Sequence, residues 1–369
     1  MLKRLGKLLG REGGGETPRL RAAVFGKHPG WADHMEEIGL ETPGLVDLRR
    51  ALYSEGIARV VDSGAWEALD DADRLERIEH TFVRRWKGTL TIGRLWPSYD
   101  GRGRKKYPMV VAVESDGLPA ARAIRLAMPA CSAAREVFVA TRDADGVRAA
   151  FATLQDDLRR LASREERAPE PPGRHLSALA SMASSPAFGG GREGLYRTMH
   201  ALEMELGAAL GASSRSAGSS ASTSLARARQ VAERGGRLRG PAPTHGAGGP
   251  ENGMGVGSAS ALSAWLDLVE PLTGGRASLL AFGAPDDAWV DVIAGDAGPS
   301  ALGCLRTGAG VLPLVTEVPY EVSDELRRRV DDALGQRPGQ TSEGLPGGSP
   351  GATEGDGAEA GGVERGSVG

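Results

Sequence analysis

Cysteine is scarce in this chain. Only Cys131 and Cys304 occur among 369 residues, and both stand among apolar or small neighbours. A disulfide framework or a structural zinc site needs more ligands at short spacing. We therefore expect two buried, reduced thiols, as in a protein from a reducing compartment.

Long apolar runs and one-sided charge are also missing. No stretch reaches the roughly 18 apolar residues that a membrane-spanning helix needs. The leucines of residues 1–11 are too scattered for the apolar region of a secretory signal. The formal net charge is −3, so no global field favours nucleic acid as a partner. These features favour a cytoplasmic protein that binds no nucleic acid.

Motifs for phosphates and activated nucleophiles are absent from the sequence as well. It holds no Gly-x-x-x-x-Gly-Lys-Ser/Thr loop and no Gly-x-Ser-x-Gly elbow after a predicted strand, since its one match to the second pattern, residues 347–351, lies in the glycine-rich tail. The stretch GRGRKK, residues 101–106, lacks the third glycine of a dinucleotide fingerprint and opens no helix. We therefore expect no cofactor.

Glycine, in contrast, is abundant, and its clusters mark the boundaries between the segments of the chain. Residues 1–18 form a flexible basic segment, whose leucines and cations would lie on opposite sides of a short helix. Residues 211–257 and 336–369 hold few large apolar side chains, so we expect a disordered linker and a disordered acidic tail. The remaining sequence forms a main domain over 19–210 and a C-terminal piece over 258–335. That piece is expected to add to the same sheet.

Strand and helix patterns interleave between these boundaries, which favours a layered α/β fold. Runs of β-branched and aromatic residues predict strands at 20–27, 81–88, 89–98, 107–115, 276–284 and 288–295. Apolar residues at helical spacing predict helices at 44–63, from 119–128 onward, and at 145–163, 192–210, 260–272 and 323–334. Residues 135–142 fit either pattern.

The stretch FGKHPGWADHMEE, residues 25–37, is the first with chemical content. His28, Asp33 and His34 could ligate zinc or iron, which would suit a metal-dependent hydrolase. However, the two histidines are six residues apart and would face opposite sides of a helix. No second group of ligands is close in sequence.

The favoured interpretation of this stretch is a loop for packing and docking. Gly26, Pro29 and Gly30 suit a tight turn. Trp31 can pack or anchor a partner, and Asp33 can cap or pair.

The second such stretch is LWPSYDGRGRKKYPM, residues 95–109. Pro97 limits the strand before it. The turn residues that follow are Ser98, Asp100, Gly101 and Gly103, and the cations among them are Arg102, Arg104, Lys105 and Lys106. This is either a solvated turn or a contact for an anion or an acidic partner.

Together these two stretches resemble the TagF family, which is associated with type VI secretion. The family pattern has a strand leading into Phe-Gly-Lys, then Pro, Gly and Asp, and later a Pro-Ser-x-Asp-x-x-Gly-Arg element followed by Pro. The matching positions are Phe25, Gly26, Lys27, Pro29, Asp33, Pro97, Ser98, Asp100, Gly103, Arg104 and Pro108. The resemblance covers about residues 20–145 and indicates a divergent member.

The resemblance implies a non-enzymatic cytoplasmic regulator built as a compact α/β sandwich with a central, mostly antiparallel sheet. Such proteins repress assembly of the secretion system after translation, by binding partners that include a forkhead-associated scaffold. They act alongside a kinase and phosphatase switch.

A physical hypothesis follows from the two stretches. Each follows a predicted strand, so both turns would form one surface if those strands are neighbours. Asp33 or Asp100 would then pair with Arg104 and lock the turns together. A peripheral membrane adaptor that makes transient contacts through residues 1–11 is the remaining alternative.

Overall fold

A computed structural model describes residues 18–70, 78–164, 191–206, 236–241, 256–273, 278–283, 289–295, 301–306, 314–316 and 321–333. The predicted flexible segment 1–18 (except Pro18), most of the linker 211–257 and the acidic tail 336–369 lie outside these residues.

Strands and helices alternate along the described chain. The strands are β1 (Arg19–Gly26), β2 (His80–Trp86), β3 (Thr89–Pro97), β4 (Pro108–Asp116), β5 (Gly236–Pro241), β6 (Leu279–Gly283) and β7 (Trp289–Ala294). The α-helices are α1 (Pro43–Leu48), α2 (Ala58–Asp62), α3 (Ala120–Ala140), α4 (Ala144–Arg164), α6 (Arg192–Ala201), α9 (Val256–Thr273) and α10 (Asp324–Ala333). The π-helical segments η2 (Arg49–Ile57) and η4 (Leu202–Leu206) and the 3₁₀ helix η5 (Ala301–Arg306) complete the fold.

All seven strands form one antiparallel sheet in the order β1-β4-β3-β2-β6-β7-β5. This confirms the α/β class with a central antiparallel sheet flanked by helices. The C-terminal strands join the N-terminal ones where β6 pairs with β2, with Phe82 opposite Phe282.

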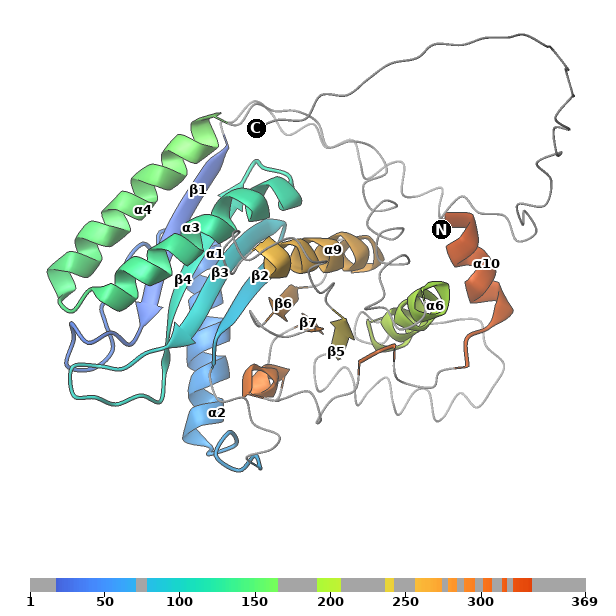
Figure 1. The fold of residues 1–369 in the computed structure, drawn as a ribbon, viewed down its shortest axis with the longest axis horizontal. Coiled ribbons are helices and arrows are strands. Elements are labelled where there is room, and N and C mark those ends of the chain that lie inside the picture. Colours follow the sequence, from blue (N-terminus) through green and yellow to red (C-terminus); the bar gives the residue numbers. More distant parts are fainter. Residues whose placement is uncertain are drawn as a thin grey trace, which may run out of the picture.

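Helices cover both faces of this sheet (Figure 1). Helices α3, α4 and α9 pack on one face, and α1, η2, α2 and η5 pack on the other. Successive residues of a strand point to opposite faces. Val24 therefore enters the first hydrophobic core, whereas Phe25 enters the second.

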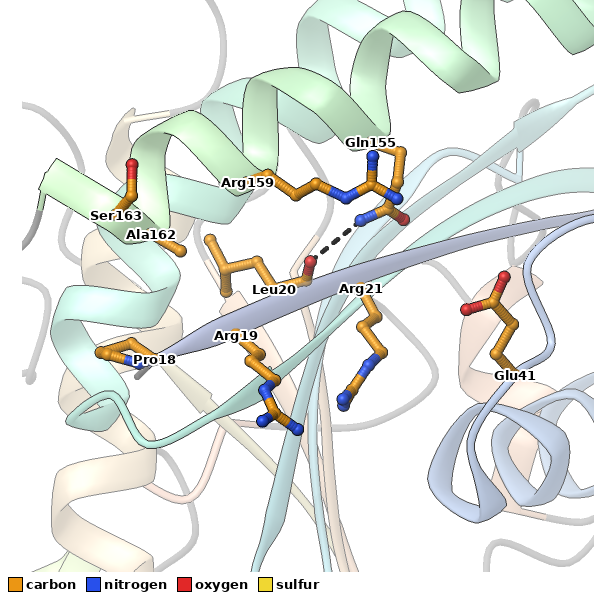
Figure 2. Close-up of a pocket in the computed structure, with 9 residues that line it drawn as sticks. All are labelled: Pro18, Arg19, Leu20, Arg21, Glu41, Gln155, Arg159, Ala162 and Ser163. Atoms are coloured by element: carbon orange, nitrogen blue, oxygen red, sulfur yellow. Dashed lines mark hydrogen bonds between the residues drawn. The ribbon is translucent and has the colours of Figure 1, made fainter. Parts of the chain in front are cut away.

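The outer edge of β1 is closed by groups that imitate a neighbouring strand. The Gln155 amide of α4 accepts a hydrogen bond from the Ala22 N–H at 2.9 Å. It also donates one to the Leu20 carbonyl at 3.1 Å, which Figure 2 shows. Further along, Val24 exchanges two backbone hydrogen bonds with Ile38. An open strand edge invites pairing with another chain, and these contacts remove much of that opportunity.

Strand β5 occupies the other end of the sheet and corrects the predicted linker, because residues 236–241 were expected to be disordered. The Arg239 guanidinium forms a buried bidentate pair with Asp291 of β7, at 2.8 and 2.9 Å. A side chain at Gly240 would collide with the Trp265 ring, so glycine is needed there for close packing. The scarcity of large apolar side chains, which suggested a linker, therefore does not prevent a strand here.

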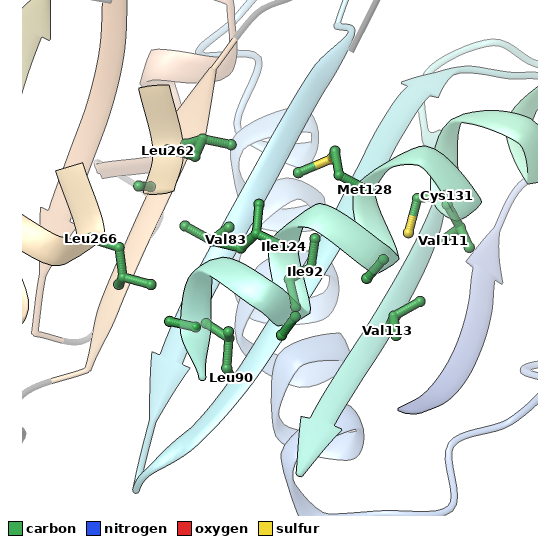
Figure 3. Close-up of a cluster of buried hydrophobic side chains, with 14 of the residues drawn as sticks. Val83, Leu90, Ile92, Val111, Val113, Ile124, Met128, Cys131, Leu262 and Leu266 are labelled. Carbon is green, nitrogen blue, oxygen red and sulfur yellow. The ribbon is translucent and has the colours of Figure 1, made fainter. Parts of the chain in front are cut away.

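Helix α3 contributes more buried residues to the core on its face of the sheet than any other described element (Figure 3). It is 21 residues long and contains Pro129 in its interior. The ambiguous residues 135–142 continue this helix as far as Ala140. Proline and β-branched residues weaken a helical pattern in sequence, but burial of Phe138 against Trp96 holds this segment in the helix.

Both cysteines are buried and neither forms a disulfide, as predicted. Burial raises the pKa of the Cys131 thiol to about 12, so it remains protonated near neutral pH. Cys131 packs among the apolar residues between α3 and the sheet and behaves as a small hydrophobic residue.

Replacing Gln155 by Ala should open the β1 edge. Two backbone groups lose their partners, so the free energy of unfolding should fall by about 1–3 kcal/mol. Self-association should increase, measured by urea denaturation and light scattering. The control is Thr153→Ala, which changes an exposed side chain on the same helix. A Gln155→Ala protein as stable and as monodisperse as the wild type would contradict this role.

Candidate functional site

The two loops singled out in the sequence begin at the same end of the sheet, where strands β1 and β3 end. Strands β1 and β3 flank β4 and are both antiparallel to it, so they run in the same direction and end together. The first loop is residues 26–34 and the second loop is residues 97–107. They meet directly, because the Gly101 N–H donates to the Trp31 carbonyl at 2.6 Å.

The start of the first loop is a close approach between strands. Gly26 has a φ of +119°, and a Cβ there would lie 2.3 Å from the Pro108 carbonyl oxygen. Only glycine fits such a position without strain. The preceding Phe25 is buried and meets the Tyr53 ring edge-on, with the ring centroids 5.7 Å apart. Both residues therefore shape the loop from inside.

A buried ion pair joins the loops. Lys27 Nζ lies 2.5 Å from Asp100 Oδ2, and the two side chains are 4% and 0% exposed. The other Asp100 oxygen accepts the backbone N–H groups of Arg102 and Arg104, each at 3.0 Å. Burial alone would raise the pKa of Asp100, but these donors outweigh it and hold the pKa far below its usual range.

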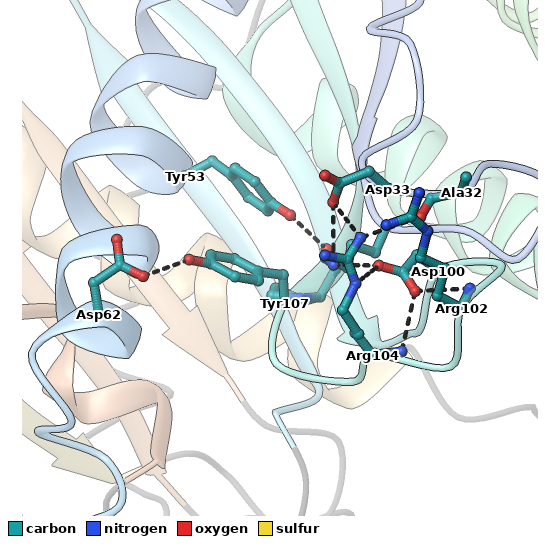
Figure 4. A network of polar contacts seen from close by, with 10 residues as sticks. Ala32, Asp33, Tyr53, Asp62, Asp100, Arg102, Arg104 and Tyr107 are labelled. Carbon is teal, nitrogen blue, oxygen red and sulfur yellow. Dashed lines mark hydrogen bonds and ion pairs between the residues drawn. The ribbon is translucent and has the colours of Figure 1, made fainter.

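Arg104 extends this pair into a network (Figure 4). Its Nε donates to Asp100 at 2.7 Å, and its terminal nitrogen lies 2.9 Å from Asp33. The same group donates to the Ala32 carbonyl at 3.1 Å. Both pairings anticipated from the sequence, Asp33 with Arg104 and Asp100 with Arg104, are present. Lys27 also lies 3.4 Å from Asp33.

The other predicted site residues have supporting positions. Trp31 is half-buried between the His28 ring and the Arg148 guanidinium. Pro97 ends β3 opposite Pro108 and begins the second loop, and the half-buried Ser98 follows it. The remaining two are Pro29, which is half-buried in the first loop, and Gly103, whose φ of +78° allows the second loop to turn.

His28 is engaged in the fold. The Gly30 N–H donates to its Nδ1 at 3.0 Å, which leaves the proton on Nε2 to be donated to the Phe138 carbonyl at 3.0 Å. The ring is buried, and this burial lowers the pKa of His28. Both nitrogens that could ligate a metal are therefore used by the backbone.

The proposed metal trio does not converge. The His34 ring packs against the Tyr53 and Tyr107 rings, and Asp33 faces Lys27 and Arg104. In the part of the chain that the structure describes, no group of three or more His, Cys, Asp or Glu side chains could hold a metal ion. This geometry does not support the hydrolase alternative.

Two tyrosines tie the loops to the helical layer, and the sequence pattern did not single them out. Tyr53 of η2 donates to the Pro108 carbonyl at 3.3 Å, and Tyr107 donates to Asp62 of α2 at 2.8 Å. Burial is the main cause that raises the pKa of Tyr107, to about 12. Tyr107 is adjacent to the second motif in the sequence, so its role in the site could have been predicted. Tyr53 lies in a helical segment far from both motifs, and nothing in the sequence indicates its role.

A small pocket lined by residues of β1 and α4 lies away from both loops (Figure 2). Its volume is about 210 Å³, below the range of about 300–1,000 Å³ that is typical of ligand sites. Two of its cations, Arg19 and Arg21, stand opposite Asp116 and Glu114 in the β1–β4 register. Cross-strand charge compensation explains these arginines without a ligand.

Comparison with models of known protein families finds no match for this chain, and comparison with curated proteins finds none either. Among the described residues, no helix has both the length and the apolar character to span a membrane.

The ion network predicts a graded set of losses. Asp100→Asn leaves the buried Lys27 ammonium with only the exposed Asp33, so the melting temperature should fall most, by about 10 °C. Lys27→Met should cost less, because Asp100 keeps Arg104 and two backbone donors. Arg104→Ala should cost about 2–4 °C, because its side chain is 46% exposed.

Thermal denaturation of the three variants gives this ranking directly. Arg160→Ala, an exposed cation on α4, is the control. If Arg104→Ala melts with the wild type but loses partner binding, Arg104 docks the partner and does not lock the loops.

Two buried imidazoles predict a stability change at mildly acidic pH. Burial lowers the pKa values of His28 and His80 below the ordinary value near 6.5. The unfolded chain therefore binds more protons below that pH, and stability should fall as the pH drops from 7 to 5.5.

The comparison variant is His80→Gln, whose amide nitrogen can still donate to the Leu305 carbonyl that His80 Nε2 contacts at 2.9 Å. Urea midpoints at the two pH values should differ less in this variant than in the wild type. The lowered carboxylate pKa values do not contribute here, because their stabilisation is lost only below about pH 5. An equal difference in both proteins would show that titration of His80 does not cause the loss of stability at low pH.

Proposed function

We propose that this protein is a non-enzymatic, cytoplasmic regulator that acts by binding other proteins through its first and second loops. One observation carries the proposal: the Lys27–Asp100–Arg104–Asp33 network joins the two motifs at one end of the sheet. A rigid sheet that presents preorganised loops suits recognition.

The residues of the network divide into an inner and an outer set. Lys27 and Asp100 are buried and hold the loops, whereas Asp33 and the residues of 101–106 are exposed and can meet a partner. Trp31 is half-buried between them and can act as an anchor, because interface hot spots are rich in tryptophan.

The resemblance to TagF supports a more specific version. The motif positions of that family coincide with residues that build the joined loops. On this basis the protein represses assembly of a type VI secretion system in a bacterium, and a forkhead-associated scaffold is its candidate partner.

The test measures secretion in the bacterium that encodes the protein. Deleting the gene should increase the amount of tube protein in the medium, and overproduction should decrease it. Trp31→Ala should abolish the effect of overproduction. The matched control is Trp86→Ala. Trp86 is also half-exposed, but it ends β2 at the other end of the strands, away from both loops.

Titration calorimetry of the purified chain with the forkhead-associated protein of the same genome identifies the partner. Unchanged secretion after both deletion and overproduction would show that the regulatory proposal is wrong.

A further inference from the structure

We propose that the second loop is a docking site for an acidic segment of a partner protein, read by the cations of residues 101–106, here called the basic loop. This inference rests on the proposed function and adds the chemistry of the partner. It follows from the charge balance and the fixed shape of this loop.

The charge balance of the basic loop is uneven. Arg104 is neutralised by Asp100 and Asp33, and Lys106 lies 3.8 Å from Glu67, with both side chains exposed. Within the described residues, the side chains of Arg102 and Lys105 have no ion-pair partner, and both residues are exposed. The loop therefore offers positive charge that the fold itself does not consume.

The shape of the loop is set from inside. The buried Asp100 carboxylate accepts two backbone N–H groups of the loop, and the Gly103 N–H donates to the Asp100 carbonyl at 2.8 Å. A run of cations on a solvated turn would lack such internal restraints. Presenting charges on a fixed backbone reduces the entropy lost on binding.

The surroundings favour a peptide segment over a flat anionic membrane. Asp62 ends α2 and Glu67 lies in the turn after it, within reach of Tyr107 and Lys106 respectively. A membrane plane would also approach these carboxylates, whereas a narrow acidic segment can follow the loop alone. Tyr99, 36% exposed and bonded to Arg142 at 2.7 Å, adds a polar aromatic contact at the start of the loop.

The probe is a fluorescein-labelled octaglutamate peptide, titrated with the full chain and followed by fluorescence anisotropy. We expect saturable binding at low ionic strength that weakens as salt is added, because exposed charges are screened. The triple variant Arg102→Ala, Lys105→Ala and Lys106→Ala should bind about tenfold more weakly.

A charge-matched control is Arg159→Ala, Arg160→Ala and Arg164→Ala, which removes three exposed cations from α4. It should bind like the wild type. Gly103→Ala keeps all the charge but strains the backbone at a φ of +78°, so it should weaken binding several-fold. Melting curves of each variant show whether the fold is retained.

Three results would overturn the inference: no binding of the peptide, equal losses in the two triple variants, or stronger capture by phosphatidylserine vesicles through the same residues. The regulatory proposal is judged separately by secretion. If secretion depends on Trp31 but octaglutamate does not bind, the proposal of a regulator is retained and the proposal of an acidic partner is rejected.

Discussion

The candidate surface depends on the buried ion pair between Lys27 and Asp100. Each charge would be costly to bury alone, because desolvation penalises an unpaired ion. Each motif supplies one partner, so neither loop can keep its conformation without the other. This mutual dependence explains why the two stretches occur in one chain, although a large part of the first domain separates them. It also assigns the lysine of the Phe-Gly-Lys turn to the interior, where a sequence alone suggests an exposed cation.

The sheet supplies the geometry that the ion pair needs. Strand β4 lies between β1 and β3, so those two strands end on the same side of the sheet and at a fixed separation. Hydrophobic cores on both faces hold the three strands in place. Tyr53 and Tyr107 then attach the loops to the helical layer. The loops are thus supported from the sheet, from the helices and from each other, and Asp33 and the cations of residues 101–106 remain exposed to solvent.

Periodicity in the sequence predicted the fold class, six of the seven strands and most of the helices, because each of these elements buries apolar residues in a regular pattern. The misses have local causes. Strand β5 is short and glycine-containing, and its stability comes from Asp291 and Trp265, which are distant in sequence. The end of α3 looked ambiguous because Pro129 and β-branched residues interrupt its pattern.

The candidate site was predicted in part for similar reasons. Turn residues and charges identified the two loops and predicted that Arg104 pairs with Asp33 or Asp100, and the structure shows both pairs. Burial of Lys27 could not be predicted, since it depends on which strands become neighbours. The role of Tyr53 was hidden for the same reason, because its hydrogen bond reaches a carbonyl 55 positions away.

The pairing of β2 with β6 bears on how the chain reaches its native state. Thr81 of β2 donates its hydroxyl proton to the Gly283 carbonyl, 202 positions later. Until that later segment has left the ribosome, β2 is an unpaired border of a four-stranded intermediate. Contacts of such long range slow folding and lengthen the exposure of nascent chains to aggregation. The centre of the finished sheet therefore forms only after most of the chain has been synthesised, and until then β2 is an edge that a chaperone could protect.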